Sequence, residues 1–152
     1  SAFVMVPERD FGIATLTNGS TVGSAFNHLM VQAALEEFAG VHVSDPVATD
    51  RGAQELEPYV GTYETVAMTI IVTPDGGGLL ADMKVKPAFL ESLGATEEEF
   101  AQPPVPLGLI DDGDAYVSTG GPAAGMKGAF FRDDDGVVTG VHMGGRYARK
   151  TS

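Results

Sequence analysis

The serines and histidines are the residues that could carry nucleophilic chemistry in this chain of 152 residues. A serine nucleophile needs an adjacent base, and many hydrolases expose it on a turn with the pattern Gly-x-Ser-x-Gly. That pattern is absent, and so is cysteine. His28, His42 and His142 fall on an expected helix, a linker and a strand, and alternation places His142 on the solvent side of its strand. We therefore predict no catalytic residue.

Two clusters of aspartates could offer carboxylate oxygens to a cation: Asp111, Asp112 and Asp114, and residues 133–135. A calcium loop of the EF-hand type needs oxygen ligands at alternate positions and a closing glutamate, and Val137 breaks that spacing. Asp and Gly tolerate the positive φ of tight hairpins, so both clusters are typical of turns. We predict no metal site and no cofactor.

Residues 76–81 fit the pattern Gly-x-Gly-x-x-Ala of dinucleotide-binding loops. Such a loop must lead into a helix, because the helix N-terminus holds the phosphates. The residues that follow alternate as in a strand and include Asp82, whose charge is wrong for phosphate. We predict a hairpin here.

The interior of a small barrel is the main candidate for a binding site. An eight-stranded barrel is just wide enough to be filled by side chains or to hold one small ligand. A filled core is the alternative, and the short strands expected here favour it. Seven aromatic and methionine side chains are candidates to line the interior: Tyr59, Tyr63, Met68, Met83, Met126, Phe130 and Met143.

Residues 52–150 must position these side chains, and they consist of short apolar runs separated by Gly, Pro and Asp turns. Consecutive hairpins of this kind tend to close into a sandwich or barrel. Residues 87–100 interrupt the pattern with an expected short helix at Pro87 and an acidic turn at Glu97, Glu98 and Glu99. The inward side chains of four strands are expected to be Val66, Met68, Ile70 and Val72; Leu79, Ala81, Met83 and Val85; Val105, Leu107 and Leu109; and Val137, Thr139, Val141 and Met143.

The first 40 residues predict two strands, joined at residues 7–10, and a helix over residues 24–39 that Ser24 caps. The second strand starts at Phe11 and ends at Thr17, and its near-continuous apolar run predicts burial on both faces. The packed face of the helix is expected to carry Phe26, Leu29, Met30, Ala33 and Phe38.

The formal net charge is −12, and residues 52–126 contain twelve acids but only two bases, Lys84 and Lys86. Such a surface repels nucleic acid and anionic lipid. No run of 18 apolar residues is present, so we expect no membrane insertion. The negative charge mainly indicates solubility, and a cationic ligand or an adaptation to salt is the alternative.

Several motifs, taken in order, resemble the C-terminal part of a serine β-lactamase or penicillin-binding protein of the class C type. Residues 3–19, FVMVPERDFGIATLTNG, are similar to the last two strands of that fold, and the helix after them to its C-terminal helix. Residues 59–64, YVGTYE, and 130–141, FFRDDDGVVTGV, are similar to a lipocalin-like domain that often follows it. The resemblance implies a mainly β fold: a small antiparallel lipocalin-like barrel of about eight strands, preceded by a strand pair and one helix.

The catalytic motifs of that family are absent from this chain. No serine has a lysine three residues later, no tyrosine has an asparagine two residues later, and no Lys-Thr-Gly is present. The resemblance therefore implies a non-catalytic accessory domain of a serine hydrolase that supports packing or self-association. A binding module for a small apolar ligand is the alternative.

The expected organisation is residues 1–40 from the hydrolase domain, a linker over residues 41–57, and the barrel over residues 58–152. The chain opens directly on a strand, which suggests a fragment of a longer protein. The expected partners are the rest of the parent hydrolase and a second copy of the chain, paired through the strand from Phe11 to Thr17 because an apolar sheet edge seeks a partner. The compartment is not readable from these residues.

Overall fold

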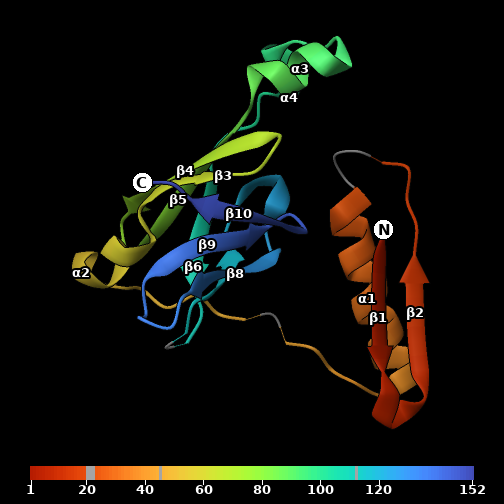
Figure 1. Cartoon of the computed structure of the whole chain (residues 1–152). Coiled ribbons are helices and arrows are strands. Elements are labelled where there is room, and N and C mark those ends of the chain that lie inside the picture. Colours follow the sequence, from red (N-terminus) through yellow and green to blue (C-terminus); the bar gives the residue numbers. More distant parts are fainter. Residues whose placement is uncertain (20–22, 45, 112) are drawn as a thin grey trace. The chain divides into compact units, whose positions relative to one another are not determined.

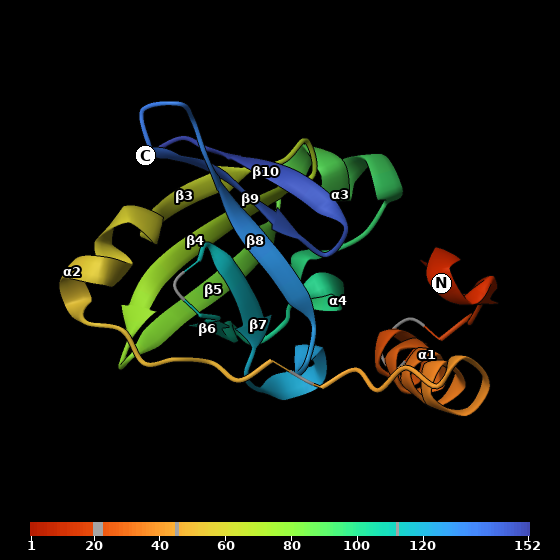
Figure 2. The ribbon, with the colours of Figure 1, turned by 90° about the horizontal axis from the view of Figure 1, so that it is seen from below.

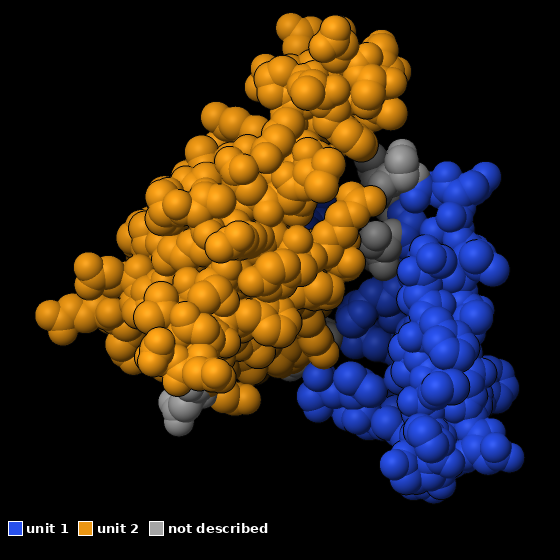
Figure 3. Space-filling model, viewed as in Figure 1, with its two compact units in different colours: residues 1–45, 122–124 blue, residues 46–121, 125–152 orange. Residues whose placement is uncertain are grey.

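The computed structural model describes residues 1–19, 23–44, 46–111 and 113–152. It divides into two compact units, residues 1–45 with 122–124 and residues 46–121 with 125–152 (Figures 1 and 3). The first contains a two-stranded sheet and a helix, and the second a closed barrel. The expected fold, mainly β with an antiparallel barrel of about eight strands after a strand pair and one helix, is confirmed. None of the described helices is long and apolar enough to span a bilayer.

In the first unit, the strands β1 (Ala2–Val6) and β2 (Phe11–Thr15) pair antiparallel, and the helix α1 (Gly23–Ala39) packs against both. The connection is the short 3₁₀ helix η1 (Pro7–Arg9). Proline starts it well, because the first N–H groups of a helix have no partner inside the helix. Asp10 ends it in the left-handed conformation, with φ of 49°.

The prediction that β2 is buried on both faces is wrong. Alternate residues of β2 are half-buried, and Gly12 and Ala14 between them are exposed. Met5 and Phe3 lie opposite these two residues on β1, and their side chains are 63 % and 67 % exposed. One helix covers only one face of a two-stranded sheet, so the other face stays open.

The helix at α1 is confirmed, but its predicted packed face is wrong. Neighbouring strands lie only about 5 Å apart, so a two-stranded sheet covers a narrow stripe of a helix. The side chain of Ser24, the expected cap, lies outside the described residues. Among the described residues of α1, those that are buried are Gly23, Asn27, Val31, Ala34, Leu35 and Ala39. The residues expected there, Phe26, Leu29, Met30, Ala33 and Phe38, are exposed.

The second half of the expected linker has structure of its own. Ala48 forms a bridge with Ile110. The helix α2 (Ala53–Leu56) follows, and its first turn is closed by the Glu55 carboxylate, which accepts the N–H of Gly52 at 2.9 Å. Residues 46–57, which the sequence analysis assigned to the linker, are thus part of the barrel unit.

The barrel is formed by eight antiparallel strands in the order β10-β3-β4-β5-β6-β7-β8-β9 (Figure 2). Each strand pairs with its neighbours in sequence, and β10 closes the barrel on β3. The strands are β3 (Gly61–Glu64), β4 (Met68–Asp75), β5 (Gly78–Val85), β6 (Val105–Leu109), β7 (Ala115–Ser118), β8 (Lys127–Arg132), β9 (Val138–Met143) and β10 (Arg146–Lys150). The remaining helices are η2 (Glu57–Tyr59), α3 (Pro87–Leu93), α4 (Glu97–Phe100) and η3 (Gly121–Ala123).

The hairpin turns predicted at residues 75–78 and 133–136 are confirmed, whereas the one predicted at residues 111–114 includes Asp112, which lies outside the described residues. Asp75 pairs with Gly78, so Gly76 and Gly77 make a two-residue turn between β4 and β5, and Gly76 has a φ of +56°. A strand follows the three glycines, so the expectation of a hairpin in place of a dinucleotide loop is confirmed. Gly136, with φ of +80°, serves the turn between β8 and β9.

The expected inward set on β9 is partly wrong. Val141 is fully buried, but Val137 is 59 % exposed and Thr139 only half-buried. The ladder between β8 and β9 shifts register next to Arg132, which moves Val138 into the core. A β-bulge of this kind changes which residues face inward and leaves no mark in the alternation of the sequence.

Two expectations next to β4 and β5 also need correction. Val66 lies in the turn before β4 and is exposed, so it does not share the inward face of that strand. The expected acidic turn is the helix α4, whereas the short helix expected at Pro87 is confirmed as α3. The Glu99 carboxylate accepts hydrogen bonds from the N–H and the hydroxyl of Thr96 at 2.8 and 3.1 Å, which forms a capping box. These bonds lower the pKa of Glu99.

Candidate functional site

The barrel interior brings together part of the predicted ligand-lining set. Tyr59, Tyr63 and Phe130 are buried. Met126 lies outside, just before β8, and is 39 % exposed. The other three residues, Met68, Met83 and Met143, are half-buried.

Four aromatic rings meet at Phe130, whose side chain is only 3 % exposed. The ring centroid of Phe130 lies 4.8 Å from that of Tyr59, 5.9 Å from that of Tyr63 and 5.6 Å from that of Tyr116. All three pairs are tilted, an arrangement that aromatic pairs prefer. These contacts place the four rings together in the core of the barrel, and the prediction of a small apolar ligand stays a prediction.

Sequence reasoning missed Tyr116, which lies on β7 and is buried. The alternation of β7 could have placed it inward, but this strand has only four residues and three of them are buried. The ring of Tyr116 lies directly over Gly128 of the neighbouring strand, because glycine leaves room for it.

The buried tyrosine hydroxyls donate to backbone carbonyls. The Tyr63 hydroxyl donates to the Tyr59 carbonyl at 2.6 Å, and the Tyr116 hydroxyl to the His142 carbonyl at 3.0 Å. Burial raises the pKa of both hydroxyls well above their usual range. Both groups therefore stay protonated at neutral pH and remain donors to these carbonyls.

A polar network closes one end of the barrel, which we call the mouth network: Tyr59, Asp114, Arg132 and the Gly136 carbonyl. The Tyr59 hydroxyl donates to Asp114 at 2.8 Å, and Arg132 Nη2 donates to the Tyr59 hydroxyl at 3.0 Å. Arg132 Nε lies 2.9 and 3.1 Å from the two carboxylate oxygens of Asp114. Arg132 Nη1 donates to the Gly136 carbonyl at 2.7 Å. The network therefore links η2, which precedes β3, to the start of β7 and the end of β8.

The charges of the mouth network are satisfied within it. Burial raises the pKa of Tyr59, and the hydrogen bond to Asp114 raises it further. For Arg132, burial lowers the pKa, but the hydrogen bonds that Arg132 donates to Tyr59 and Asp114 outweigh this effect, and the net shift of the pKa is upward. Lys150 lies nearby and donates to the Pro58 carbonyl at 2.7 Å, and its pKa is lowered by burial and by the charge of Arg132. A phenol that stays protonated and a carboxylate bound on both oxygens make a poor general base.

The histidines occupy three separate elements. His28 is on α1, and His42 Nδ1 lies 3.6 Å from a carboxylate oxygen of Glu36. His142 lies on β9 and is exposed, as its alternation predicted.

The described aspartates of the two clusters lie in or next to turns between strands. Asp133 Oδ1 accepts the N–H groups of Asp135 and Val137 at 3.1 and 2.9 Å. Asp114 belongs to the mouth network, and Asp112 lies outside the described residues. Within the described ranges, no group of three or more His, Asp or Glu side chains is placed to hold a metal ion.

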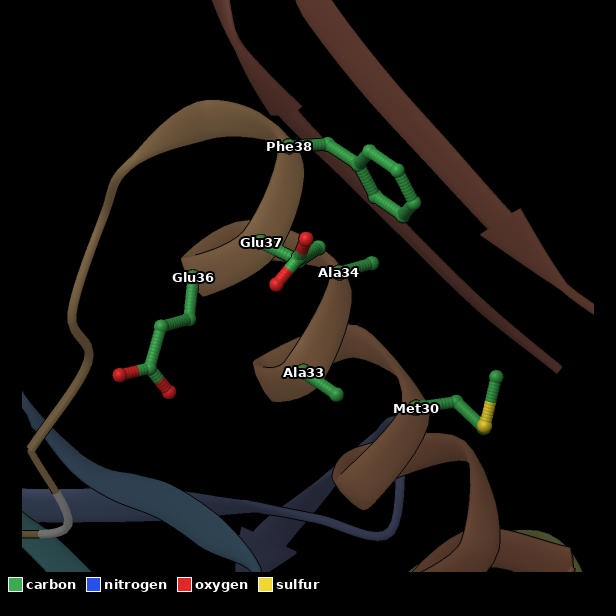
Figure 4. A pocket seen from close by; sticks show the side chains of 6 residues that line it. All are labelled: Met30, Ala33, Ala34, Glu36, Glu37 and Phe38. Atoms are coloured by element: carbon green, nitrogen blue, oxygen red, sulfur yellow. The ribbon is translucent and has the colours of Figure 1, made fainter.

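Two grooves lie along α1 in the first unit. One has a volume of about 410 Å³ and includes Gln32 and His42. In the other, Met30 and Phe38 point to the side of α1 on which the strands run, whereas Glu36 points away from them (Figure 4). This groove has a volume of about 430 Å³ and is lined by Met30, Ala33, Ala34, Glu36, Glu37 and Phe38.

Comparison with known proteins leaves the family of this chain open. No protein-family model matches the chain, and no curated protein is significantly similar to it. A crystal structure of SurE with D-Leu is 26 % identical with a TM-score of 0.47, and the match covers 87 % of this chain and 28 % of that one. A second crystal structure of SurE gives the same identity and TM-score over 85 % and 27 % of the two chains. The chain spans less than a third of the SurE chains, and at this TM-score the likeness assigns neither fold nor function.

The protonation of the buried tyrosines gives a prediction that alkaline titration can check. In the folded chain, Tyr59, Tyr63 and Tyr116 should not ionise near the usual tyrosine pKa, because burial disfavours the charged form. A group whose pKa is higher in the folded than in the unfolded chain contributes its full stabilisation at pH values below its pKa in the unfolded chain. This contribution is lost as the pH rises through its pKa in the folded chain. The barrel should therefore lose stability above about pH 10, where unfolded tyrosine ionises.

Tyrosinate absorbance, followed together with circular dichroism, measures both events. We expect these three tyrosines to ionise only as the barrel unfolds. Ionisation of all four tyrosines of the chain near their usual pKa, with the fold intact, would contradict the burial described here.

Proposed function

We propose that this chain is a non-catalytic accessory domain of a β-lactamase-related serine hydrolase, which it supports by packing against the enzyme or by self-association. The motifs over residues 3–19, 59–64 and 130–141 resemble the C-terminal part of such enzymes, and their nucleophile and base motifs are missing from the sequence. A barrel interior that is filled with aromatic rings also supports a role that needs no substrate cavity.

The observation that carries this proposal is the incomplete cover of α1. Met30 and Phe38 point toward the strand side of the helix, yet they are 42 % and 75 % exposed. The apolar side chains of Phe3 and Met5 on the open face of the sheet are exposed as well. Exposed apolar patches of this kind mark interaction surfaces. Further strands beside β1 and β2, such as those of a hydrolase sheet, would widen the sheet and cover the helix.

The edges of the small sheet are suited to this pairing. Neither β1 nor β2 contains a charged residue or a proline, the residues that commonly protect an exposed sheet edge. An isolated pair of strands is also marginally stable by itself. The partner proposed for these edges is the rest of the parent hydrolase, or a second copy that pairs through the strand between Phe11 and Thr17.

Turnover measurements test the non-catalytic role. The purified chain should hydrolyse nitrocefin and p-nitrophenyl esters no faster than a heat-unfolded sample of the same preparation, because the sequence lacks the Ser-x-x-Lys, Tyr-x-Asn and Lys-Thr-Gly motifs of the family. Variants His42→Ala and His142→Ala serve as controls and should leave any background rate unchanged. Saturable turnover that survives repurification, and that one of these variants abolishes, would refute the proposal.

A further inference from the structure

We propose that two copies of this chain associate through their barrel units, with an acidic arm of each copy bound to a basic face of the other. The acidic arm is residues 87–102, which contain α3 and α4. The basic face is the outer surface of β8, β9 and β10 and carries Lys127, Phe131, His142, Tyr147 and Arg149. This extends the self-association part of the proposed function to a named surface, separate from the strand edges of the first unit.

The acidic arm combines negative charge with exposed apolar side chains. Its only charged residues are glutamates, four in number and all exposed: Glu91, Glu97, Glu98 and Glu99. Phe89, Leu93 and Phe100 are 37 %, 53 % and 40 % exposed. Figure 1 shows α3 and α4 projecting away from the barrel strands. The arm therefore offers apolar anchors within a ring of carboxylates.

The basic face has the complementary composition. β8, β9 and β10 contain no acid but five of the nine Lys and Arg residues of the chain. Phe130, Val141 and Ala148 are buried and lie opposite one another in the ladder, so their neighbours in sequence face outward. Among these, Phe131 and Tyr147 form an edge-to-face pair with centroids 5.7 Å apart, and both are about half exposed. Exposed aromatic rings next to arginine are typical of interface hot spots.

The cations of the basic face are available to a partner. In the described part of the chain, neither Lys127 nor Arg149 forms an ion pair with a carboxylate. Glu64 lies opposite Arg149 in the ladder, but it is bound by Lys86 at 2.9 Å. Arg132, by contrast, is already committed to Asp114.

A second copy is the occupant that these observations favour. The net charge of −12 disfavours anionic lipid and nucleic acid as ligands of a basic face. The acidic arm of a second copy supplies both carboxylates and apolar side chains. The attraction between arm and face outweighs the repulsion between the net charges of the two copies, because salt screens charges beyond about 8–10 Å. Two reciprocal contacts, each arm on the other face, form a closed twofold dimer.

A charge-swap cycle, measured by sedimentation equilibrium, tests this dimer. Glu91→Lys with Glu98→Lys brings the net charge of the arm from −4 to 0 and leaves Glu99, which caps α4, in place. Lys127→Glu with Arg149→Glu reverses the charge of the basic face from +2 to −2. We expect each pair to weaken the dimer about tenfold or more, and the combination of both pairs to restore affinity to within about threefold of the original chain. The original dimer should also weaken as salt is raised from about 0.05 to 0.5 M.

The matched control is Glu57→Lys with Asp75→Lys, which changes the net charge as the arm variant does but lies on exposed positions away from the arm. It should leave the dimer as tight as before, and circular dichroism verifies the fold of every variant. A monomer at all concentrations, or a dimer that neither the swaps nor salt affects, would overturn the proposal. So would two weakened swap variants whose combination fails to regain affinity. None of these results bears on catalysis, so turnover assays judge the accessory role separately.

Discussion

Replacing Phe130 by alanine should lower the free energy of unfolding of the barrel by about 3–5 kcal/mol, the usual cost of deleting a buried aromatic side chain. Phe130 is 3 % exposed, and its ring contacts those of Tyr59, Tyr63 and Tyr116. Alanine would leave a cavity between these rings, and their hydroxyls hold them in place by hydrogen bonds to Asp114 and to backbone carbonyls. The site therefore cannot collapse to fill the space. Urea unfolding, followed by tyrosine fluorescence and circular dichroism, measures the change.

The next residue provides a matched control. Phe131 differs from Phe130 only in the face of β8 that it occupies, and its side chain is 46 % exposed. Phe131→Ala should cost about 1 kcal/mol or less, mainly from the lost contact with Tyr147. Equal effects of the two substitutions would mean that Phe130 is not the centre of the barrel core.

The barrel was predictable because Asp and Gly residues mark its turns in the sequence. In the turn between β8 and β9, the short side chain of Asp133 accepts backbone N–H groups, and Gly136 adopts a positive φ. Alternation then assigns most inward residues of β5 and β6, such as Leu79 and Leu107, which are buried. These signals are local, so they can be recognised from the sequence without any knowledge of the fold.

The errors arose where a residue's surroundings depend on distant parts of the chain. Both sides of α1 are apolar, so only the position of the sheet decides that Val31 is buried and Phe38 exposed. The bulge on β9 depends on its pairing with β8.

The mouth network could not be predicted for the same reason. Tyr59 and Asp114 are 55 residues apart, and Tyr59 and Arg132 are 73 apart. The local sequence predicts Tyr59 in the barrel interior and Asp114 in a turn, and neither pattern connects the two residues. Nothing local to Arg132 marks it as the partner of both.

Gly128→Ala should destabilise the barrel by about 3 kcal/mol, at the upper end of the cost of overpacking a core. A methyl group on Gly128 would overlap the ring and hydroxyl of Tyr116 and also the backbone carbonyl oxygen of His142. The ring cannot rotate freely, because Tyr116 is buried and its hydroxyl donates to that same carbonyl. The carbonyl belongs to β9, which pairs with β8, so moving it would disturb the ladder.

Two further variants separate the steric effect from the loss of the hydrogen bond. Gly113→Ala is the matched control, since its new methyl group would meet only an ordinary van der Waals neighbour at 3.9 Å, and it should change stability by less than about 1 kcal/mol. Tyr116→Phe keeps the ring but removes the hydroxyl, and it should cost about 1 kcal/mol. If Gly128→Ala cost no more than Tyr116→Phe, the ring of Tyr116 could not lie over Gly128, and the close packing of β7 on β8 would have to be different. A large cost for Gly128→Ala alone, measured by thermal unfolding, is the result that this packing requires.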